Sequence, residues 1–299
     1  MTASGKMVYV IAGPTASGKT DLSLKLARFL DTAIISADSR QCYRETTIGT
    51  AKPSLSVRAE IPHYFIDQFP ITQDITAADF EKLALGYLHD IFQYKDAAIV
   101  CGGTGLYIKA LCEGLDTMPA VKNEIVQEVN RTYKERGIQW LQETVLKEDP
   151  LFAAQGEMQN PARMIRALVF IRSTGSSITT YKTGTKKKRD FHVVKFAPTI
   201  SREKLYERIN LRVDNMINQG LVEEAQKLYP YRHLKNLQTV GYTELFEHFD
   251  GKYDLETAIE KIKQHTRNYA KRQLTWFRKD KEIEWIDFEA PDVLKRIFT

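Results

Sequence analysis

The chain has 299 residues, of which 43% are hydrophobic and 27% charged, and its formal net charge is +5. This composition is typical of a folded globular protein with a sizeable core, and it excludes a disordered or fibrous chain. Since no apolar run approaches the roughly 20 residues that a membrane helix needs, we expect no membrane association. The three cysteines form no Cys-X-X-Cys pair and the first six residues are polar, which predicts a cytoplasmic protein without disulfides or a zinc cluster.

A glycine-containing loop near the start of the chain organises the rest of the sequence. An apolar run over residues 7–12 predicts a strand, and leucines at helical spacing over residues 22–30 predict a helix. The loop between them consists of Gly13, Pro14, Thr15, Ala16, Ser17, Gly18, Lys19 and Thr20. It matches the phosphate-binding P-loop in the required context of strand, loop and helix. Backbone N–H groups and Lys19 suit a polyphosphate, and the Thr20 hydroxyl suits Mg2+, but the loop alone does not identify the polyphosphate.

Two further buried strands are predicted to end at the same edge of a parallel sheet. The strand over residues 33–37 is followed by Asp38, and the strand over 97–101 runs into Gly102-Gly103-Thr104-Gly105. Asp38 is either a site residue or the cap of the next helix. The second glycine turn either lets backbone approach a ligand or is a plain tight turn. The strand over 97–101 lacks the Walker-B aspartate that an ordinary P-loop hydrolase carries. Asp38 is then the carboxylate at a strand end near the P-loop, and its role is that of a metal ligand, a general base or a cap.

The remaining elements predict an α/β protein in which a P-loop NTPase-like core with a parallel sheet carries a mostly helical insertion and a helical C-terminal region. Residues 45–75 are predicted to be mainly loop with a short strand at 64–66, and 76–94 a helix. A strand over 191–196 returns the chain to the sheet, and the last third is predicted to be helical. We assign residues 1–117 and 190–299 to the core and 118–189 to the insertion.

Two stretches of the chain carry basic residues without any acidic ones. Residues 158–189 contain eight lysines or arginines, and residues 261–279 contain seven, interleaved with Tyr269, Trp276 and Phe277. Such clusters are the footprint of a polyanion partner, and aromatic side chains add the capacity to stack on bases. The run from Lys186 to Arg189 could equally be a solvated loop, and the three aromatic residues could belong to the core.

Together these residues resemble a known family. The segments 13–20, 38–43 and 102–107, with Asn160-Pro161-Ala162-Arg163, Val240-Gly241-Tyr242 and 271–278, are similar in order and type to those of the tRNA dimethylallyltransferases, in their bacterial form. The resemblance spans residues 7–280. It implies transfer of the dimethylallyl group from dimethylallyl diphosphate to the exocyclic amine of the tRNA adenosine 3′ of the anticodon. The implied partners are the tRNA anticodon stem-loop and the prenyl donor, the implied cofactor is Mg2+, and we expect a monomer.

The resemblance also implies roles for individual residues. Asp38 would accept the proton of the amine, Thr104 would position the base or stabilise the leaving diphosphate, and Lys19 would stabilise its charge. The residues 13–20, together with Arg202 and Arg208, would hold the donor, with Thr20 on the metal. The residues expected to contact tRNA are Asp38, Ser39, Arg40, Gln41, Ala162, Arg163, Met164, Ile165, Arg166, Lys271, Arg272, Gln273, Trp276 and Arg278.

One departure from the family pattern concerns Ala162, which stands where the family usually has glutamine, so one tRNA contact is in question. Two other functions remain open on the residues themselves. A small-molecule P-loop kinase accounts for the loop and the metal but not for the acid-free basic stretches. A nucleic-acid-binding module without catalysis accounts for the basic stretches but gives no function to the P-loop.

Overall fold

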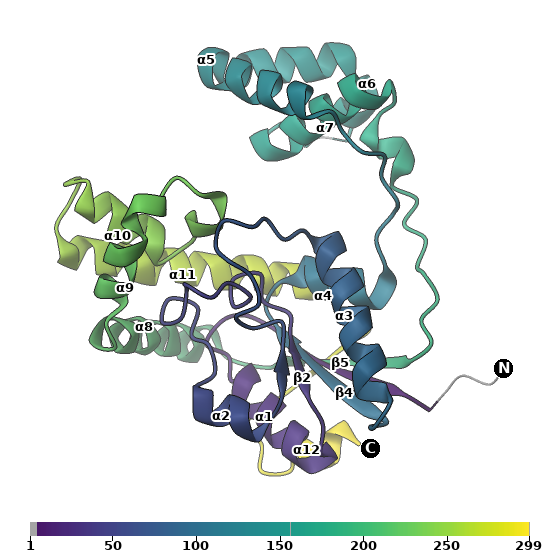
Figure 1. Cartoon of the computed structure of the whole chain (residues 1–299), viewed down its shortest axis with the longest axis vertical. Coiled ribbons are helices and arrows are strands. Elements are labelled where there is room, and N and C mark those ends of the chain that lie inside the picture. The colour runs from purple at the N-terminus through teal and green to yellow at the C-terminus, as the bar shows by residue number, and fades with distance from the viewer. Residues whose placement is uncertain (1–4, 156, 299) are drawn as a thin grey trace. The chain divides into compact units, whose positions relative to one another are not determined.

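The computed structural model describes residues 5–155 and 157–298 and contains a six-stranded parallel sheet (Figure 1). Its strands run in the order β3-β2-β4-β1-β5-β6. They span Met7–Ala12 (β1), Ile34–Ser36 (β2), His63–Tyr64 (β3), Ala97–Gly102 (β4), His192–Pro198 (β5) and Ile283–Ile286 (β6). All neighbouring strands pair in parallel, so their carboxyl ends share one edge. The predicted parallel α/β core is confirmed. Residues 1–4, most of the polar N-terminal segment considered above, lie outside the described residues.

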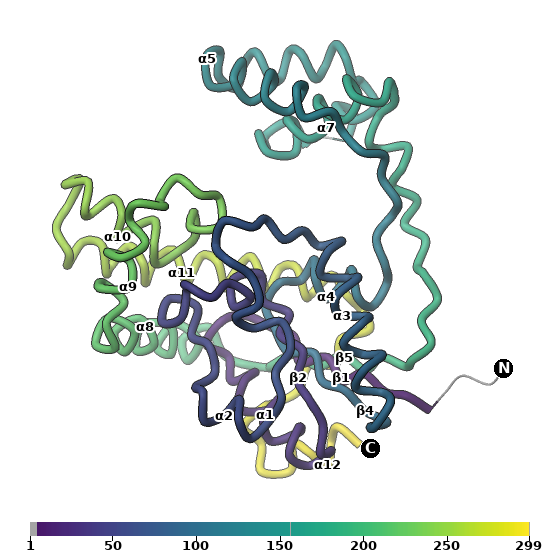
Figure 2. The backbone as a smooth tube through the Cα atoms, viewed as in Figure 1, coloured from purple at the N-terminus to yellow at the C-terminus, as the bar shows by residue number. Residues whose placement is uncertain are grey.

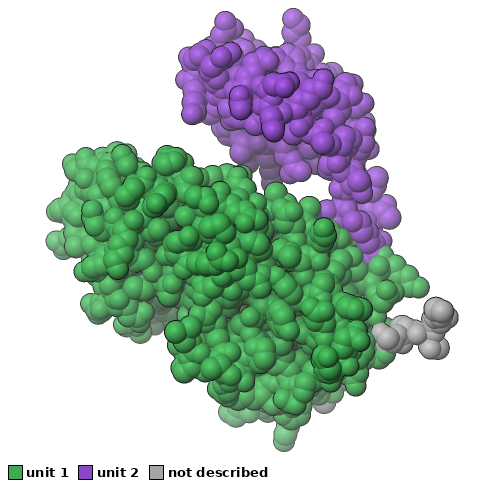
Figure 3. Space-filling model, viewed as in Figure 1, with its two compact units in different colours: residues 1–114, 188–299 green, residues 115–187 purple. Residues whose placement is uncertain are grey.

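The chain forms two compact units (Figure 3), of which one comprises residues 1–114 and 188–299 and the other residues 115–187. The second unit starts three residues before, and ends two residues before, the insertion assigned from the sequence. The segments over 115–122 and 182–187 contain no helix or strand, and Figure 2 traces them as the chain enters and leaves the second unit.

Both faces of the sheet are covered in the first unit. Successive residues of a strand point to opposite faces, so Val8 and Val10 of β1 enter one apolar core while Tyr9 and Ile11 enter the other. The helices of this unit are α1 (Lys19–Leu30), α2 (Leu55–Glu60), α3 (Ala77–Phe92), α4 (Gly105–Glu113), α8 (Arg202–Asn218), α9 (Leu221–Leu228), α10 (Tyr242–Phe249), α11 (Leu255–Phe277) and α12 (Val293–Ile297). Short 3-10 turns occupy Tyr229–Tyr231 and Lys235–Leu237.

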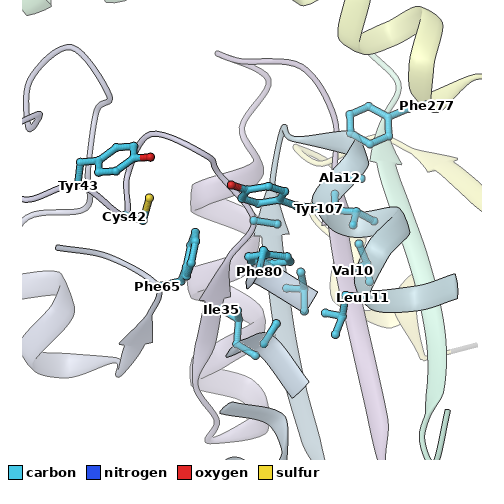
Figure 4. Close-up of a cluster of buried hydrophobic side chains, with 14 of the residues drawn as sticks. Val10, Ala12, Ile35, Cys42, Tyr43, Phe65, Phe80, Tyr107, Leu111 and Phe277 are labelled. Atoms are coloured by element: carbon cyan, nitrogen blue, oxygen red, sulfur yellow. The ribbon is translucent and has the colours of Figure 1, made fainter. Parts of the chain in front are cut away.

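An aromatic cluster fixes α3 and α4 against the sheet. The rings of Phe80 and Tyr107 stack with their centroids 4.4 Å apart, and Phe65 meets the Phe80 ring edge-on at 5.0 Å (Figure 4). Such pairs add about 0.5–1.5 kcal/mol each to the burial of their area. Cys42 is fully buried in the same cluster.

The structure corrects the predicted elements at three places. Helix α2 lies inside the stretch predicted as loop, where the Ser54 side chain accepts a hydrogen bond from Val57 N and caps it. The short strand at 64–66 is instead His63–Tyr64. Strand β6 lies in the last third, which was predicted to be wholly helical. Strand β6 has four residues, of which Ile283 and Ile286 are buried, Glu284 is exposed and Trp285 is partly buried, so it is too short for an alternating pattern to stand out.

The second unit has its own small core, which packs Val129 and Leu141 against Met164, Leu168 and Phe170. Its elements are α5 (Asn123–Glu148), α6 (Pro150–Ala153), α7 (Pro161–Thr174) and a 3-10 turn over Ile178–Tyr181. Helix α5 is interrupted where Gly137 adopts a φ of 75°, a left-handed conformation that glycine tolerates. The prediction that this part of the chain is mostly helical is confirmed. In the described part of the chain, no helix is both long and apolar enough to cross a membrane.

Candidate active site

A cavity of about 410 Å³ lies in the first unit, where the P-loop and the segments that follow β2 and β4 meet α8, α9 and α11. Ligands of open parallel sheets bind at this carboxyl edge. The cavity is lined by Thr15, Lys19, Thr20, Asp38, Ser39, Arg40, Gln41, Gly49, Thr50, Ala51, Cys101, Gly102, Gly103, Arg212, Val213, Met216, Leu221, Thr239, Val240, Gly241, Ile262, Thr266, Tyr269 and Gln273. It thus gathers residues from most of the length of the first unit.

The P-loop joins β1 to α1 and contributes three residues to the cavity wall. Gly18 has a φ of 86° as the N-cap of α1, a value that favours glycine. Inside the loop, the Pro14 carbonyl accepts hydrogen bonds from the Ser17 hydroxyl at 2.8 Å and from Lys19 Nζ at 2.5 Å. Burial lowers the pKa of Lys19 to about 8. An anion bound beside this ammonium would restore the stability of its charged form, so Lys19 is poised for phosphate. Gly13, Pro14, Ala16, Ser17 and Gly18 shape the loop without lining the cavity.

The glycines of the second turn make room for protein groups. A Cβ atom on Gly103 would lie 2.2 Å from Nε2 of Gln273, and one on Gly105 would lie 2.1 Å from the indole nitrogen of Trp276. Gln273 Nε2 donates to the Gly103 carbonyl at 2.9 Å, while its Oε1 accepts from Thr15 N at 2.9 Å. A single buried amide of α11 therefore ties the P-loop to the turn after β4, a function that the sequence did not reveal.

Asp38 combines the two roles that the sequence left open. Its Oδ1 accepts a hydrogen bond from Arg40 N at 2.8 Å, as in a capping turn, and the residue also lines the cavity. Thr104 is hydrogen-bonded to this turn. Its hydroxyl oxygen accepts from Ser39 N at 3.0 Å, and its own N–H donates to Ala37 O at 3.1 Å. Thr104 does not line the cavity, so the structure assigns it contact with the Asp38 turn.

Of the arginines on α8, the structure brings Arg212 to the cavity and not Arg202 or Arg208. Arg202 lies over the ring of Tyr206 at 5.1 Å, and Arg208 forms an ion pair with Glu289. Neither arginine lines the cavity, although Nη1 of Arg208 lies 3.9 Å from where a Cβ atom on Gly18 of the P-loop would stand, so their diphosphate contacts stay predictions. Burial lowers the pKa of Arg212, and the Asp38 carboxylate opposes that shift. The sequence held one signal for Arg212, since it follows Arg208 by four residues on the same helix.

The residues predicted to contact tRNA from α11 differ in what they present to solvent. Lys271, Arg272 and Arg278 are exposed, and Trp276 is 41% exposed. Gln273 is 7% exposed and lines the cavity, and both ends of its amide are bound to backbone. On the turn after β2, Ser39, Arg40 and Gln41 line the cavity together with Asp38.

The predicted tRNA residues of the second unit lie in the first turns of α7. Asn160 caps this helix, because its Oδ1 accepts a hydrogen bond from Arg163 N at 3.2 Å. Arg163 and Arg166 are exposed, as is Ala162, and Arg163 pairs with Glu157. The side chain of Met164 is fully buried and that of Ile165 partly so. Their predicted contact with RNA would have to come from the backbone or from a rearranged helix.

Several relatives match this arrangement along nearly the whole chain. The first strand of the sheet leads through a P-loop into a helix, and a basic cavity lies at the carboxyl edge of the sheet. These two features define the class of phosphate-binding P-loop α/β proteins. Within that class, the family model described as IPP transferase matches residues 41–280, and the chain belongs to this family.

The tRNA dimethylallyltransferase of Christiangramia forsetii is 48% identical over 93% of this chain and 92% of its own. The crystal structure of tRNA isopentenylpyrophosphate transferase from Bacillus halodurans is 37% identical, with a TM-score of 0.71 over 98% of this chain and 93% of that one. A eukaryotic dimethylallyltransferase acting on tRNA is 25% identical, with a TM-score of 0.82 over 98% of this chain and 78% of that one.

Proposed function

We propose that this protein transfers the dimethylallyl group from dimethylallyl diphosphate to the exocyclic amine of the tRNA adenosine 3′ of the anticodon, releasing diphosphate. Membership of the IPP transferase family and relatives named tRNA dimethylallyltransferase support transfer to tRNA. The structural neighbour described as acting on tRNA supports the same acceptor. The donor and the position of the target base rest on the resemblance in sequence and on the cavity.

The observation that carries the proposal is that the cavity wall offers both positive charge and apolar side chains. Lys19 and Arg212 supply positive charge near the P-loop. The apolar side chains are those of Val213, Met216, Leu221, Val240 and Ile262. A diphosphate suits the positive charge and a short branched hydrocarbon suits the apolar side chains, which is the chemistry of a prenyl diphosphate.

The reaction needs charge stabilisation at one end and proton removal at the other. As the carbon–oxygen bond to the diphosphate breaks and the carbon–nitrogen bond forms, negative charge grows on the leaving group. Lys19, Arg212 and the P-loop N–H groups are suited to stabilise that charge. The amine loses one proton, and Asp38 is suited to accept it. The turn uses only Oδ1 of Asp38 among the bonds of the described residues, so Oδ2 is available for the amine.

Mg2+ is the cofactor expected at a P-loop that holds a diphosphate. Thr20 lines the cavity next to Lys19 and offers a hydroxyl oxygen. Mg2+ commonly takes one or two protein oxygens and completes its shell with phosphate oxygens and water, so the residue fits the ion. When bound, Mg2+ would neutralise part of the charge of the diphosphate. We also propose that the protein acts as a monomer, and its tRNA substrate supports a cytoplasmic location.

Incubation of the purified protein with dimethylallyl diphosphate, Mg2+ and unmodified tRNA, followed by mass analysis of the nucleosides, tests the proposal. We expect one adenosine of the anticodon loop to gain a dimethylallyl group in place of one hydrogen, and the Lys19→Ala variant to yield far less. If the folded protein leaves the tRNA unmodified, or phosphorylates a small acceptor from ATP instead, the proposed function is wrong. Phosphorylation would support the kinase that the P-loop alone allows, and binding of tRNA without either reaction would support the non-catalytic module.

A further inference from the structure

The loop over residues 46–51 forms part of the cavity wall although it belongs to no helix or strand. Gly49, Thr50 and Ala51 line the cavity. The backbone groups of such a loop have no sheet or helix to pair with and need other partners. The residues that supply those partners therefore fix the position of this part of the cavity wall.

One carboxylate of α9 holds three successive N–H groups of the loop. Oε2 of Glu224 accepts from Thr47 N at 3.0 Å and from Ile48 N at 2.8 Å, and Oε1 accepts from Gly49 N at 3.0 Å. Successive N–H groups turned toward one point form a concave anion site, and here the anion is a side chain of the same protein. Charge-assisted hydrogen bonds of this kind are about twice as strong as neutral ones.

Tyr242, which follows Val240 and Gly241 of the cavity wall, completes this arrangement. Its hydroxyl donates to Oε1 of Glu224 at 2.6 Å, and its side chain is fully buried. Burial and the charge of Glu224 raise the pKa of the Tyr242 phenol, so the group keeps its proton and remains a donor. The ring also lies against Gly49, where a Cβ atom would come within 2.6 Å of the ring carbon Cζ.

The loop is in turn tied to the segment that carries Asp38. Gln41 Nε2 donates to the carbonyls of Thr50 at 3.1 Å and Ala51 at 3.3 Å. Thr46 Oγ1 donates to the carbonyl of Arg40 at 3.2 Å. A shift of the loop would pull on these three bonds and move the turn from Asp38 to Gln41.

From these contacts we propose that Glu224 and Tyr242 are positioning residues. They hold the loop over residues 46–51, and through this loop they hold the Asp38 turn in the geometry that prenyl transfer requires. The inference rests on the proposed function for its kinetic consequences. Its structural part, the hold of Glu224 on three backbone N–H groups, is independent of what the protein catalyses.

Two variants and two matched controls test this proposal. Glu224→Gln keeps the size of the side chain but replaces one acceptor oxygen with an NH2 group that faces N–H donors. Tyr242→Phe removes only the hydroxyl and keeps the ring against Gly49. Glu223→Gln changes the neighbouring carboxylate on the same helix, and Tyr229→Phe removes another phenol–carboxylate bond, to Asp250, that does not involve the loop.

Hydrogen exchange measured by mass spectrometry gives a readout that does not depend on activity. We expect the peptide over residues 44–52 of Glu224→Gln to exchange roughly 10-fold faster or more, because each lost hydrogen bond of ordinary strength corresponds to a factor of about that size. Both controls should exchange like the unaltered protein. Unchanged exchange of this peptide in Glu224→Gln would overturn the proposal.

The kinetic test uses the complete protein with tRNA and dimethylallyl diphosphate. We expect kcat/KM for the donor to fall about 10- to 100-fold in Glu224→Gln and by a smaller factor in Tyr242→Phe, since small displacements of reacting groups have effects of this order. Normal donor kinetics with a lowered Tm would mean that the pair only stabilises the fold and would overturn its positioning role. If the unaltered protein transfers no prenyl group, the proposed function fails, and the exchange experiment still decides whether Glu224 holds the loop.

Discussion

Arg212 and Asp38 lie on the wall of the same cavity, and the carboxylate of Asp38 opposes the fall in the pKa of Arg212 that burial causes. Arg212 comes from the middle of α8, whereas Asp38 follows β2, so the pair exists only in the folded protein. A cation suited to the leaving diphosphate and a base suited to the amine thus share one small space. Both bond changes of prenyl transfer could take place between them.

We expect Arg212→Ala to lower kcat/KM for dimethylallyl diphosphate by about 10²–10³, the usual cost of removing a group that stabilises developing charge. Arg208→Ala is the matched control, because Arg208 lies one helical turn away and pairs with Glu289 outside the cavity. It should change kcat/KM by no more than a few fold. Steady-state kinetics with varied donor at saturating tRNA makes the measurement. Equal losses in both variants would restore the diphosphate contact that the sequence assigned to Arg208.

We expect Asp38→Asn to reduce kcat by about 10²–10⁴, the range that general-base catalysis contributes. Asparagine keeps an oxygen that can accept from Arg40 N, so the turn should survive while the base is lost. Single-turnover transfer and tRNA binding should be measured on the same preparation. Loss of transfer with unchanged tRNA affinity agrees with a base, and near-normal turnover would rule that role out.

The pKa of Lys19, which burial lowers to about 8, predicts how donor binding depends on pH. Below pH 8 the ammonium is charged and attracts the diphosphate. Above pH 8 the free protein loses this proton, and a bound diphosphate must restore it, so affinity falls as pH rises. Between pH 7 and pH 9, KM for the donor should increase by roughly 10-fold, since one pKa unit corresponds to a tenfold change in protonation.

Lys19→Arg provides the control for this pH dependence, because a guanidinium stays charged throughout that range. Its KM for the donor should be nearly flat between pH 7 and pH 9, whatever its absolute value. A flat profile in the unaltered protein would show that Lys19 does not titrate in this range or does not meet the diphosphate.

The parts of the site that could be predicted from the sequence are those in which neighbouring residues carry the signal. The P-loop, the buried strand over 97–101 and the polar residues from Asp38 onward are continuous segments with their own periodicity or motif. The parallel sheet then implied that their ends meet. Local sequence patterns were sufficient there, because each of these elements contributes to the site the residues at its own end.

Arg212, Gln273 and Glu224 could not be assigned in this way, because their partners lie far away along the chain. Gln273 binds Thr15 and Gly103, and nothing in its own helix distinguishes it from an exposed glutamine. The same limit explains the two glycines of the second turn. The sequence left open whether they let backbone approach a ligand or form a plain tight turn, and only the fold reveals that a glutamine and a tryptophan lie close to them.

The bridging amide of Gln273 leads to a prediction about stability and donor binding together. Gln273→Ala would leave Thr15 N and the Gly103 carbonyl without their partner, and such buried losses cost about 1–3 kcal/mol each. Gln264→Ala, at an exposed position of the same helix, removes an equivalent side chain and is the matched control. We expect the free energy of unfolding to fall in Gln273→Ala and to change little in the control.

Because Thr15 lines the cavity, KM for the donor should also rise in Gln273→Ala even well below its Tm. Denaturant unfolding and donor kinetics at low temperature separate the two effects. A variant that is destabilised but binds the donor normally would mean that Gln273 supports the fold without shaping the P-loop. If instead tRNA affinity is lost while stability and KM for the donor are unchanged, the contact with tRNA expected from the sequence is the correct role, and α11 must rearrange to expose this amide.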